Sequence, residues 1–180
     1  MPVVRGKDIE VLFSASAIAR RNLELAKEIA DRHFENLLVV SVLKGSFVFA
    51  ADLIRAMHDV GISPEVEFIF ISSYGAGTAS GEVKLLRDVD NNVSGRDILV
   101  IDDILESGKT LKFIRDLMLS RGARSVSIAA LLDKRMRRKA DIDADFVGFD
   151  CPDYFVVGYG MDVSHAFREL PFVGVVKGDA

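Results

Sequence analysis

The chain has 180 residues, of which 49% are hydrophobic, and a formal net charge of -4. This size and apolar content suit one substantial core, so we expect a single domain over residues 1–180. The acidic balance argues against general nucleic-acid binding, and the single cysteine excludes an internal disulfide and indicates a reducing, cytoplasmic compartment. The charged first residues do not resemble a signal peptide, and no apolar run approaches membrane-spanning length, so we expect no membrane partner.

Apolar residues recur with helical spacing in some segments and form short aliphatic runs typical of strands in others. The two kinds of segment alternate, which predicts an α/β fold with a parallel sheet. The run from Ile98 to Ile101 is too apolar to alternate and predicts a central strand buried on both faces. In chain order we expect a helix at about 16–34, a strand at 37–43, a helix at 47–57, strands at 65–71, 83–86 and 98–101, a helix at 111–118, and strands at 125–132, 146–149, 155–160 and 172–176.

Acidic and small residues follow the central strand. Asp102, Asp103 and Glu106 precede the run Ser107-Gly108-Lys109-Thr110, whose backbone N–H groups could enclose a phosphate at the start of the next helix. A nucleotide triphosphatase P-loop also ends in Gly-Lys-Thr, but it requires a glycine where this chain has Asp103. An acidic helix cap explains one or two acids and not all three. We therefore expect Asp102 and Asp103 to bind the hydroxyls of a sugar whose phosphate lies in the loop.

Other polar residues also follow predicted strands. Lys44 and Gly45 suit a second phosphate, although an ordinary surface lysine is equally compatible with the spacing. Lys134 could donate a hydrogen bond to a ligand carbonyl oxygen, and the alternative is a solvated lysine. Taken alone, Phe155 is more typical of a core aromatic. Residues 73–82 contain three glycines and no large aliphatic side chain, so we expect a mobile connection that could close over a site.

The stretch 98–110 resembles the ribose-5-phosphate signature of the type I phosphoribosyltransferases: an aliphatic strand, two acids, two aliphatic residues, an acid and a small-residue turn. Leu43-Lys44-Gly45, Ser73-Tyr74, Leu132-Asp133-Lys134 and the segment 155–168 resemble further motifs of the hypoxanthine-guanine subfamily, in the same order along the chain. The resemblance covers about residues 39–176. It implies the type I phosphoribosyltransferase fold: a central, mostly parallel sheet flanked by helices, a small hood formed by the N- and C-terminal segments, and a flexible catalytic loop at about 73–82.

The resemblance also implies an activity. It is the transfer of the 5-phosphoribosyl group from phosphoribosyl pyrophosphate to hypoxanthine or guanine, with Mg²⁺, to give IMP or GMP and pyrophosphate. The resemblance implies that Glu106 is the catalytic base and that the 5′-phosphate is bound by Glu106, Ser107, Gly108, Lys109 and Thr110. It implies that Asp102 and Asp103 bind ribose and Mg²⁺, and that pyrophosphate is bound by Lys44, Gly45 and Arg168, often with a cis peptide before the lysine. It places Ser73 and Tyr74 in the catalytic loop and assigns the purine to Lys134, Phe155, Val156 and Asp162, of which Asp162 also binds Mg²⁺.

One position departs from the family pattern. The family commonly has aspartate where this chain has Glu106, so the reach of the proposed base must differ.

Two other functions stay open at this point: a phosphoribosyltransferase for xanthine or another base, and an RNA-binding regulator with the same fold, which the acidic balance disfavours. The family forms dimers and tetramers, and we expect a homodimer or homotetramer.

Overall fold

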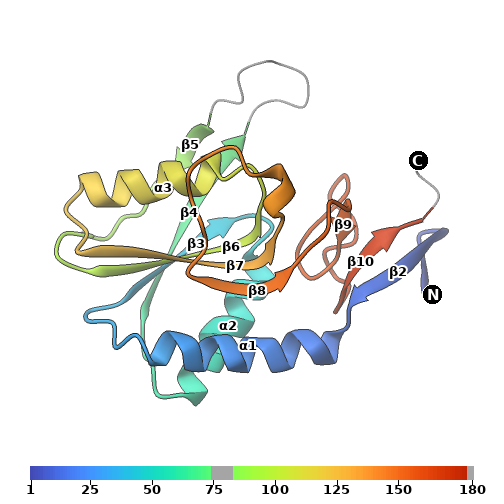
Figure 1. The fold of residues 1–180 in the computed structure, drawn as a ribbon, viewed down its shortest axis with the longest axis horizontal. Coiled ribbons are helices and arrows are strands. Elements are labelled where there is room, and N and C mark those ends of the chain that lie inside the picture. The colour runs from blue at the N-terminus through green and yellow to red at the C-terminus, as the bar shows by residue number, and fades with distance from the viewer. Residues whose placement is uncertain (74–82, 178–180) are drawn as a thin grey trace.

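The computed structural model describes residues 1–73 and 83–177. A six-stranded sheet forms the centre of the molecule, in the order β5-β4-β3-β6-β7-β8. Helices α1 and α2 cover one face of this sheet and α3 covers the other (Figure 1). The elements are β3 (Leu38–Leu43), β4 (Glu65–Ser73), β5 (Val83–Arg87), β6 (Asp97–Leu105), β7 (Ser125–Asp133) and β8 (Phe146–Asp150), with α1 (Ala15–Ala30), α2 (Phe47–Asp59) and α3 (Lys109–Ser120).

Every neighbouring pair in this sheet is parallel except β4 and β5, which are antiparallel. The predicted α/β fold with a mostly parallel sheet is therefore confirmed. Because the strands are parallel, the loops that follow β3, β6 and β7 emerge at one edge of the sheet. This is the edge at which ligands bind in open α/β folds.

The central strand is buried as predicted, since Ile98 to Ile101 are each 0% exposed. Its side chains alternate between two cores: Leu99 and Ile101 join the cluster with α1 and α2, and Ile98 and Val100 join the cluster with α3. The predicted end of the strand is wrong. Strand β6 continues to Leu105 because residues 102, 104 and 105 still pair with β7, so Asp102 and Asp103 lie within the strand.

A second, four-stranded sheet joins the two ends of the chain, in the order β1-β2-β10-β9. Its strands are β1 (Val3–Val4), β2 (Lys7–Phe13), β10 (Val173–Val176) and β9 (Val156–Val157). Strands β2 and β10 lie side by side, to the right of the main sheet in Figure 1. This sheet corresponds to the hood that the family resemblance implies, although β1 and β2 were not among the expected strands.

Two further boundaries differ from the expectations by more than two residues. Helix α1 ends at Ala30, four residues before the predicted end. The expected strand at 155–160 is reduced to Val156–Val157, because Gly158, Tyr159 and Gly160 all have positive φ and cannot continue a strand. Most of the predicted catalytic loop, Tyr74 included, lies outside the described residues. Among the helices described here, none combines the length and the apolar character needed to cross a membrane.

Candidate active site

A cavity of about 650 Å³ opens at the carboxyl ends of the main-sheet strands. Two other cavities, of about 580 and 660 Å³, contain none of the predicted acids or small-residue turn. The 650 Å³ cavity is therefore the candidate active site. Nine of the predicted site residues line it: Lys44, Gly45, Asp103, Glu106, Lys134, Phe155, Val156, Asp162 and Arg168. Asp102 precedes Asp103 in β6, and residues 107–110 follow Glu106 directly along the chain.

The two aspartates at the end of β6 form a strained electrostatic pair. The Asp103 N–H donates to Asp102 Oδ1 at 2.9 Å, and the Ile104 N–H donates to Asp103 Oδ1 at 2.9 Å. Burial raises the pKa of Asp102 well above its ordinary value, and the neighbouring Asp103 carboxyl raises it further. Burial also raises the pKa of Asp103, against the opposing effects of hydrogen bonds and of the Arg168 charge. A pair of this kind is stabilised by a bound cation or by hydroxyl donors.

The loop after β3 approaches Asp103 very closely. A Cβ atom added at Gly45 would lie only 1.9 Å from Asp103 Oδ2, so a larger residue here requires the loop or the Asp103 carboxylate to move. The peptide bond between Leu43 and Lys44 is cis, as the family resemblance implies. Lys44 is exposed, and its Nζ lies 5.5 Å from the centre of the Phe70 ring. The loop therefore presents a positive side chain and an unobstructed backbone to the cavity.

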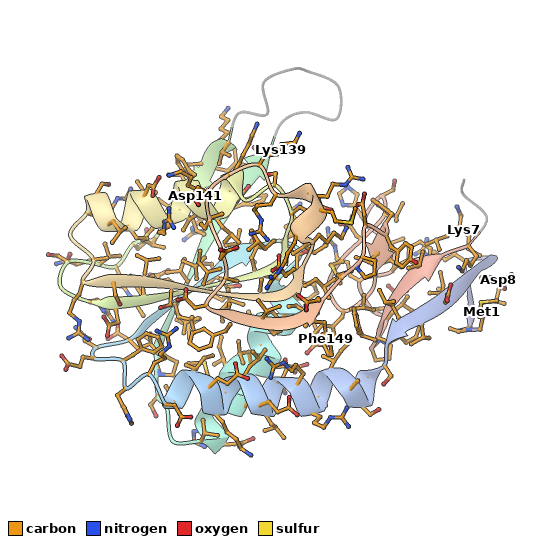
Figure 2. The ribbon with its side chains drawn as sticks, in the orientation of Figure 1. Met1, Lys7, Asp8, Lys139, Asp141 and Phe149 are labelled. Carbon is orange, nitrogen blue, oxygen red and sulfur yellow. The ribbon has the colours of Figure 1, made fainter. Side chains whose placement is uncertain are left out.

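The small-residue turn leads directly into α3. Gly108 is the N-cap with φ of 79°, and the helix begins at Lys109, so Lys109 and Thr110 belong to its first turn. The Ser107 carbonyl accepts the N–H groups of Lys139 and Ala140, at 3.0 and 2.9 Å. Figure 2 shows Lys139 and Asp141 on the segment that passes over the start of α3. This segment fixes the turn, and the positive end of α3 favours an anion there.

Lys134 and Glu106 form an ion pair, with 2.7 Å between Nζ and Oε1. The Lys134 side chain is 5% exposed and that of Glu106 is 49% exposed. The alternative of a solvated lysine is therefore wrong. Sequence reasoning selected both residues but not their contact, because the strand ends that carry them are far apart along the chain.

The C-terminal segment supplies an aromatic ring and a second ion pair. Phe155 is 67% exposed, so the alternative of a core aromatic is wrong. Arg168 Nη2 lies 2.9 Å from Asp162 Oδ1. Arg168 Nη1 also donates to the Gly160 carbonyl at 2.7 Å, and the His165 N–H donates to Asp162 Oδ2 at 2.7 Å. His165 lines the cavity and was not predicted, since an isolated loop histidine gives no sequence signal.

Comparison with known proteins decides the family. Residues 9–164 match the model of the phosphoribosyl transferase domain. The chain belongs to this family. A Bacillus subtilis protein named hypoxanthine-guanine phosphoribosyltransferase is 47% identical to it over 173 residues, which cover 94% of each chain. This phosphoribosyltransferase is therefore an enzyme of the transferase class, as the sequence motifs indicated.

Solved structures agree with this assignment. A hypoxanthine phosphoribosyltransferase from Staphylococcus aureus has a TM-score of 0.87 and 42% identity, over 93% of this chain and 91% of that one. A hypoxanthine-guanine phosphoribosyltransferase from Bacillus anthracis, with a HEPES molecule in its active site, has a TM-score of 0.86 and 43% identity, over 94% and 99%. The predicted type I phosphoribosyltransferase fold is confirmed.

The carboxylate oxygens in the cavity could supply part of the coordination shell of Mg²⁺. Within residues 1–73 and 83–177, no three His, Cys, Asp or Glu side chains are grouped to hold a metal by themselves. Asp103 nevertheless directs Oδ2 toward Gly45, and a nearby cation would stabilise the charged form of its half-buried carboxyl. Mg²⁺ commonly binds through one or two carboxylates, with substrate phosphates and water completing its shell. The phosphoribosyltransferase site suits that arrangement.

Proposed function

We propose that this phosphoribosyltransferase transfers the 5-phosphoribosyl group of phosphoribosyl pyrophosphate to hypoxanthine or guanine, releasing pyrophosphate, as a step of purine salvage. The observation that supports this best is a single cavity lined by the cations Lys44 and Arg168, the acid Asp103, the buried cation Lys134 and the exposed ring of Phe155. These groups match a phosphorylated sugar, a charged leaving group and an oxo-substituted aromatic base. The name of the Bacillus subtilis relative agrees with this substrate pair.

The phosphoribosyl group is assigned to the end of β6 and the start of α3. Backbone N–H groups of the turn and of the first helical residues hold the 5′-phosphate, and the helix dipole adds to this attraction. Asp102 and Asp103 accept hydrogen bonds from the ribose hydroxyls. The residues for the phosphate are Glu106, Ser107, Gly108, Lys109 and Thr110.

Pyrophosphate is assigned to Lys44, Gly45 and Arg168. Gly45 leaves the backbone accessible, and the two cations offset the negative charge of the leaving group. Asp102, Asp103 and Asp162 would hold Mg²⁺ together with substrate oxygens. When bound, Mg²⁺ would offset the negative charge that the pyrophosphate gains as the bond between pyrophosphate and ribose weakens.

The purine is assigned to the C-terminal side of the cavity. Phe155 stacks on the ring, Lys134 donates to the 6-oxo group, and the Val156 backbone and Asp162 contact the purine edge. Adenine carries an amino group at position 6, which cannot accept from a lysine. That amino group would place a hydrogen-bond donor against the Lys134 ammonium, which is 4% exposed, and we therefore expect hypoxanthine and guanine to be preferred over adenine.

Glu106 is assigned as the base. Its carboxylate accepts the proton of the purine ring nitrogen as that nitrogen bonds to ribose C1 and the bond between C1 and the pyrophosphate oxygen breaks. Ser73 and Tyr74 are assigned to a loop that covers the reacting atoms and excludes water. Ser73 ends β4, and Tyr74 lies outside the described residues.

We further propose one phosphoribosyltransferase domain over residues 1–180, a homodimer or homotetramer, and a cytoplasmic location. The oligomer is checked by light scattering of the purified protein. The RNA-binding alternative requires free positive charge, but the three arginines that follow β7 have acidic partners: Arg135 pairs with Asp133, Arg137 with Asp153, and Arg138 with Asp133 and Asp143. A salt-sensitive RNA gel shift would favour that alternative.

The deciding experiment measures pyrophosphate release from phosphoribosyl pyrophosphate and Mg²⁺ with a panel of hypoxanthine, guanine, xanthine, adenine and uracil. We expect turnover with hypoxanthine or guanine and little with adenine. Turnover with adenine at a comparable rate, or with xanthine or uracil alone, contradicts the assignment. The variant Asp103→Ala serves as the control, because it removes the proposed ribose acceptor and should abolish most of the turnover.

A further inference from the structure

A tight turn joins Val156 to Met161, both of which line the candidate active-site cavity. Gly158, Tyr159 and Gly160 have φ values of 94°, 49° and 98°. Glycine adopts such values readily, whereas tyrosine rarely does. Tyr159 is nevertheless 5% exposed, so contacts of its side chain must hold this conformation.

The Tyr159 hydroxyl connects the turn to both helices on one face of the main sheet. Asn22 of α1 donates from Nδ2 to the hydroxyl at 2.9 Å, and the hydroxyl donates to Asp52 Oδ2 of α2 at 2.5 Å. Burial and the hydrogen bond to Asp52 raise the pKa of Tyr159, so the phenol keeps its proton. Asn22 Oδ1 is buried and has no hydrogen-bond partner among the described residues. The tyrosine is therefore a main polar anchor of this turn.

The same turn contacts both parts of the proposed pyrophosphate site. Gly160 donates its N–H to the Arg168 carbonyl at 3.0 Å and accepts the Arg168 guanidinium at 2.7 Å. A Cβ atom added at Gly160 would lie 2.4 Å from the Gly45 carbonyl oxygen. Gly160 therefore links Tyr159 to Arg168, whose guanidinium it accepts, and to Gly45, against which it lies.

We propose that Tyr159 is a positioning residue for pyrophosphate recognition, acting through Gly160 on Arg168 and Gly45. The inference rests on the proposed function, in which those two residues bind pyrophosphate. The proposed site of the 5′-phosphate lies at the start of α3, and the hydrogen bonds of Tyr159 run to α1 and α2 instead. Loss of the tyrosine hydroxyl should therefore weaken pyrophosphate binding selectively.

The test compares the parent with Tyr159→Phe by calorimetric titration with Mg²⁺-pyrophosphate and, separately, with ribose 5-phosphate, which lacks the purine. We expect the affinity for pyrophosphate to fall roughly five- to tenfold, the range of one lost hydrogen bond, and the affinity for ribose 5-phosphate to change less than about twofold. Asp52→Asn keeps an oxygen that accepts from the hydroxyl and should resemble the parent, whereas Asp52→Ala should resemble Tyr159→Phe. Combined with Arg168→Met, the tyrosine substitution should add little further loss.

Ile29→Val is the control for general destabilisation, because Ile29 is fully buried in α1 and lies outside the candidate active-site cavity. It should lower the melting temperature without changing either affinity. Equal losses for pyrophosphate and ribose 5-phosphate in Tyr159→Phe, or no loss at all, overturn the positioning role. If the parent itself binds neither pyrophosphate nor phosphoribosyl pyrophosphate, the proposed function fails and this inference fails with it.

Discussion

Lys134 Nζ lies 2.7 Å from Glu106 Oε1, so the proposed donor to the purine oxygen and the proposed base are in direct contact. Lys134 is nearly buried, and the glutamate provides its charge partner. Because an ammonium has three donor hydrogens, Lys134 can donate to a 6-oxopurine while it keeps its contact with Glu106. The extra methylene of glutamate, relative to the aspartate that is common in the family, lengthens the side chain that makes this contact.

Glu106→Gln tests the proton transfer. The amide keeps the shape of the side chain but cannot act as a base, so we expect turnover to fall about 100-fold or more. The measurement is the steady-state rate with saturating phosphoribosyl pyrophosphate and hypoxanthine. A rate within about threefold of the parent removes Glu106 from the chemical step.

Lys134→Met tests base selection. Methionine fills a similar volume without a donor, so we expect the KM for hypoxanthine to rise about tenfold or more, in line with the loss of a charged hydrogen bond. The KM for phosphoribosyl pyrophosphate should change little. The preference for hypoxanthine over adenine should decrease. An unchanged preference would show that another group recognises the substituent at position 6 of the purine.

Gly45→Ala tests the close approach to Asp103. The new Cβ would lie 1.9 Å from Asp103 Oδ2, so the loop or the carboxylate must move. We expect the KM for phosphoribosyl pyrophosphate to rise at least about tenfold, since misplacement of about 1 Å costs roughly 100-fold in some sites. Gly61→Ala is the matched control, because an added Cβ there meets nothing within 4 Å and only the positive φ is strained. It should affect stability and not KM.

Asp102→Asn tests the stability cost of the buried acid pair. The pKa of Asp102 is raised in the folded chain, so the folded state retains a proton over a pH range in which the unfolded state has lost it. Stability from this residue is therefore full below the ordinary pKa of about 3.9 and falls as pH rises through the raised value. At pH 7 in EDTA, Asp102→Asn should raise the melting temperature by about 2 °C or more and lower the activity.

Asp97→Asn is the matched substitution at the other end of β6, with the opposite sign. Hydrogen bonds from Arg124 lower the pKa of Asp97, so its contribution is present above the ordinary pKa and lost as pH falls through the lowered value. Asp97 also accepts from the Glu35 N–H at 2.8 Å and from Ser125 Oγ at 2.7 Å. Asp97→Asn should lower the melting temperature at pH 7, and thermal scans from pH 8 to well below pH 4 should show this difference shrinking as Asp97 becomes protonated.

The regular elements of the main sheet could be predicted because their apolar spacing reflects burial on a helix face or within a sheet. The end of β6 could not, since Asp102 has low strand propensity and is held in the strand by its pairing with Ala130 of β7. Strand β2 was missed for a related reason. Its partner β10 lies more than 150 residues away, and local pattern does not reveal such pairing.

The site was predictable where residue type alone carries the chemistry, as with the acids of β6 and the small residues before α3. Contacts between distant loops were not, as with Lys134 and Glu106, which are joined only by the parallel register of β6 and β7. Tyr159 gave no signal for a different reason. A buried tyrosine resembles any core aromatic until its hydroxyl partners are known.

The exposed ring of Phe155 also offers a direct optical reporter. The chain contains no tryptophan, so Phe155→Trp introduces a single indole at the mouth of the cavity, where 67% of the native side chain is open to solvent. Stacking of a purine on this indole should quench its fluorescence. Base binding can then be followed in real time, separately from catalysis and without a labelled ligand.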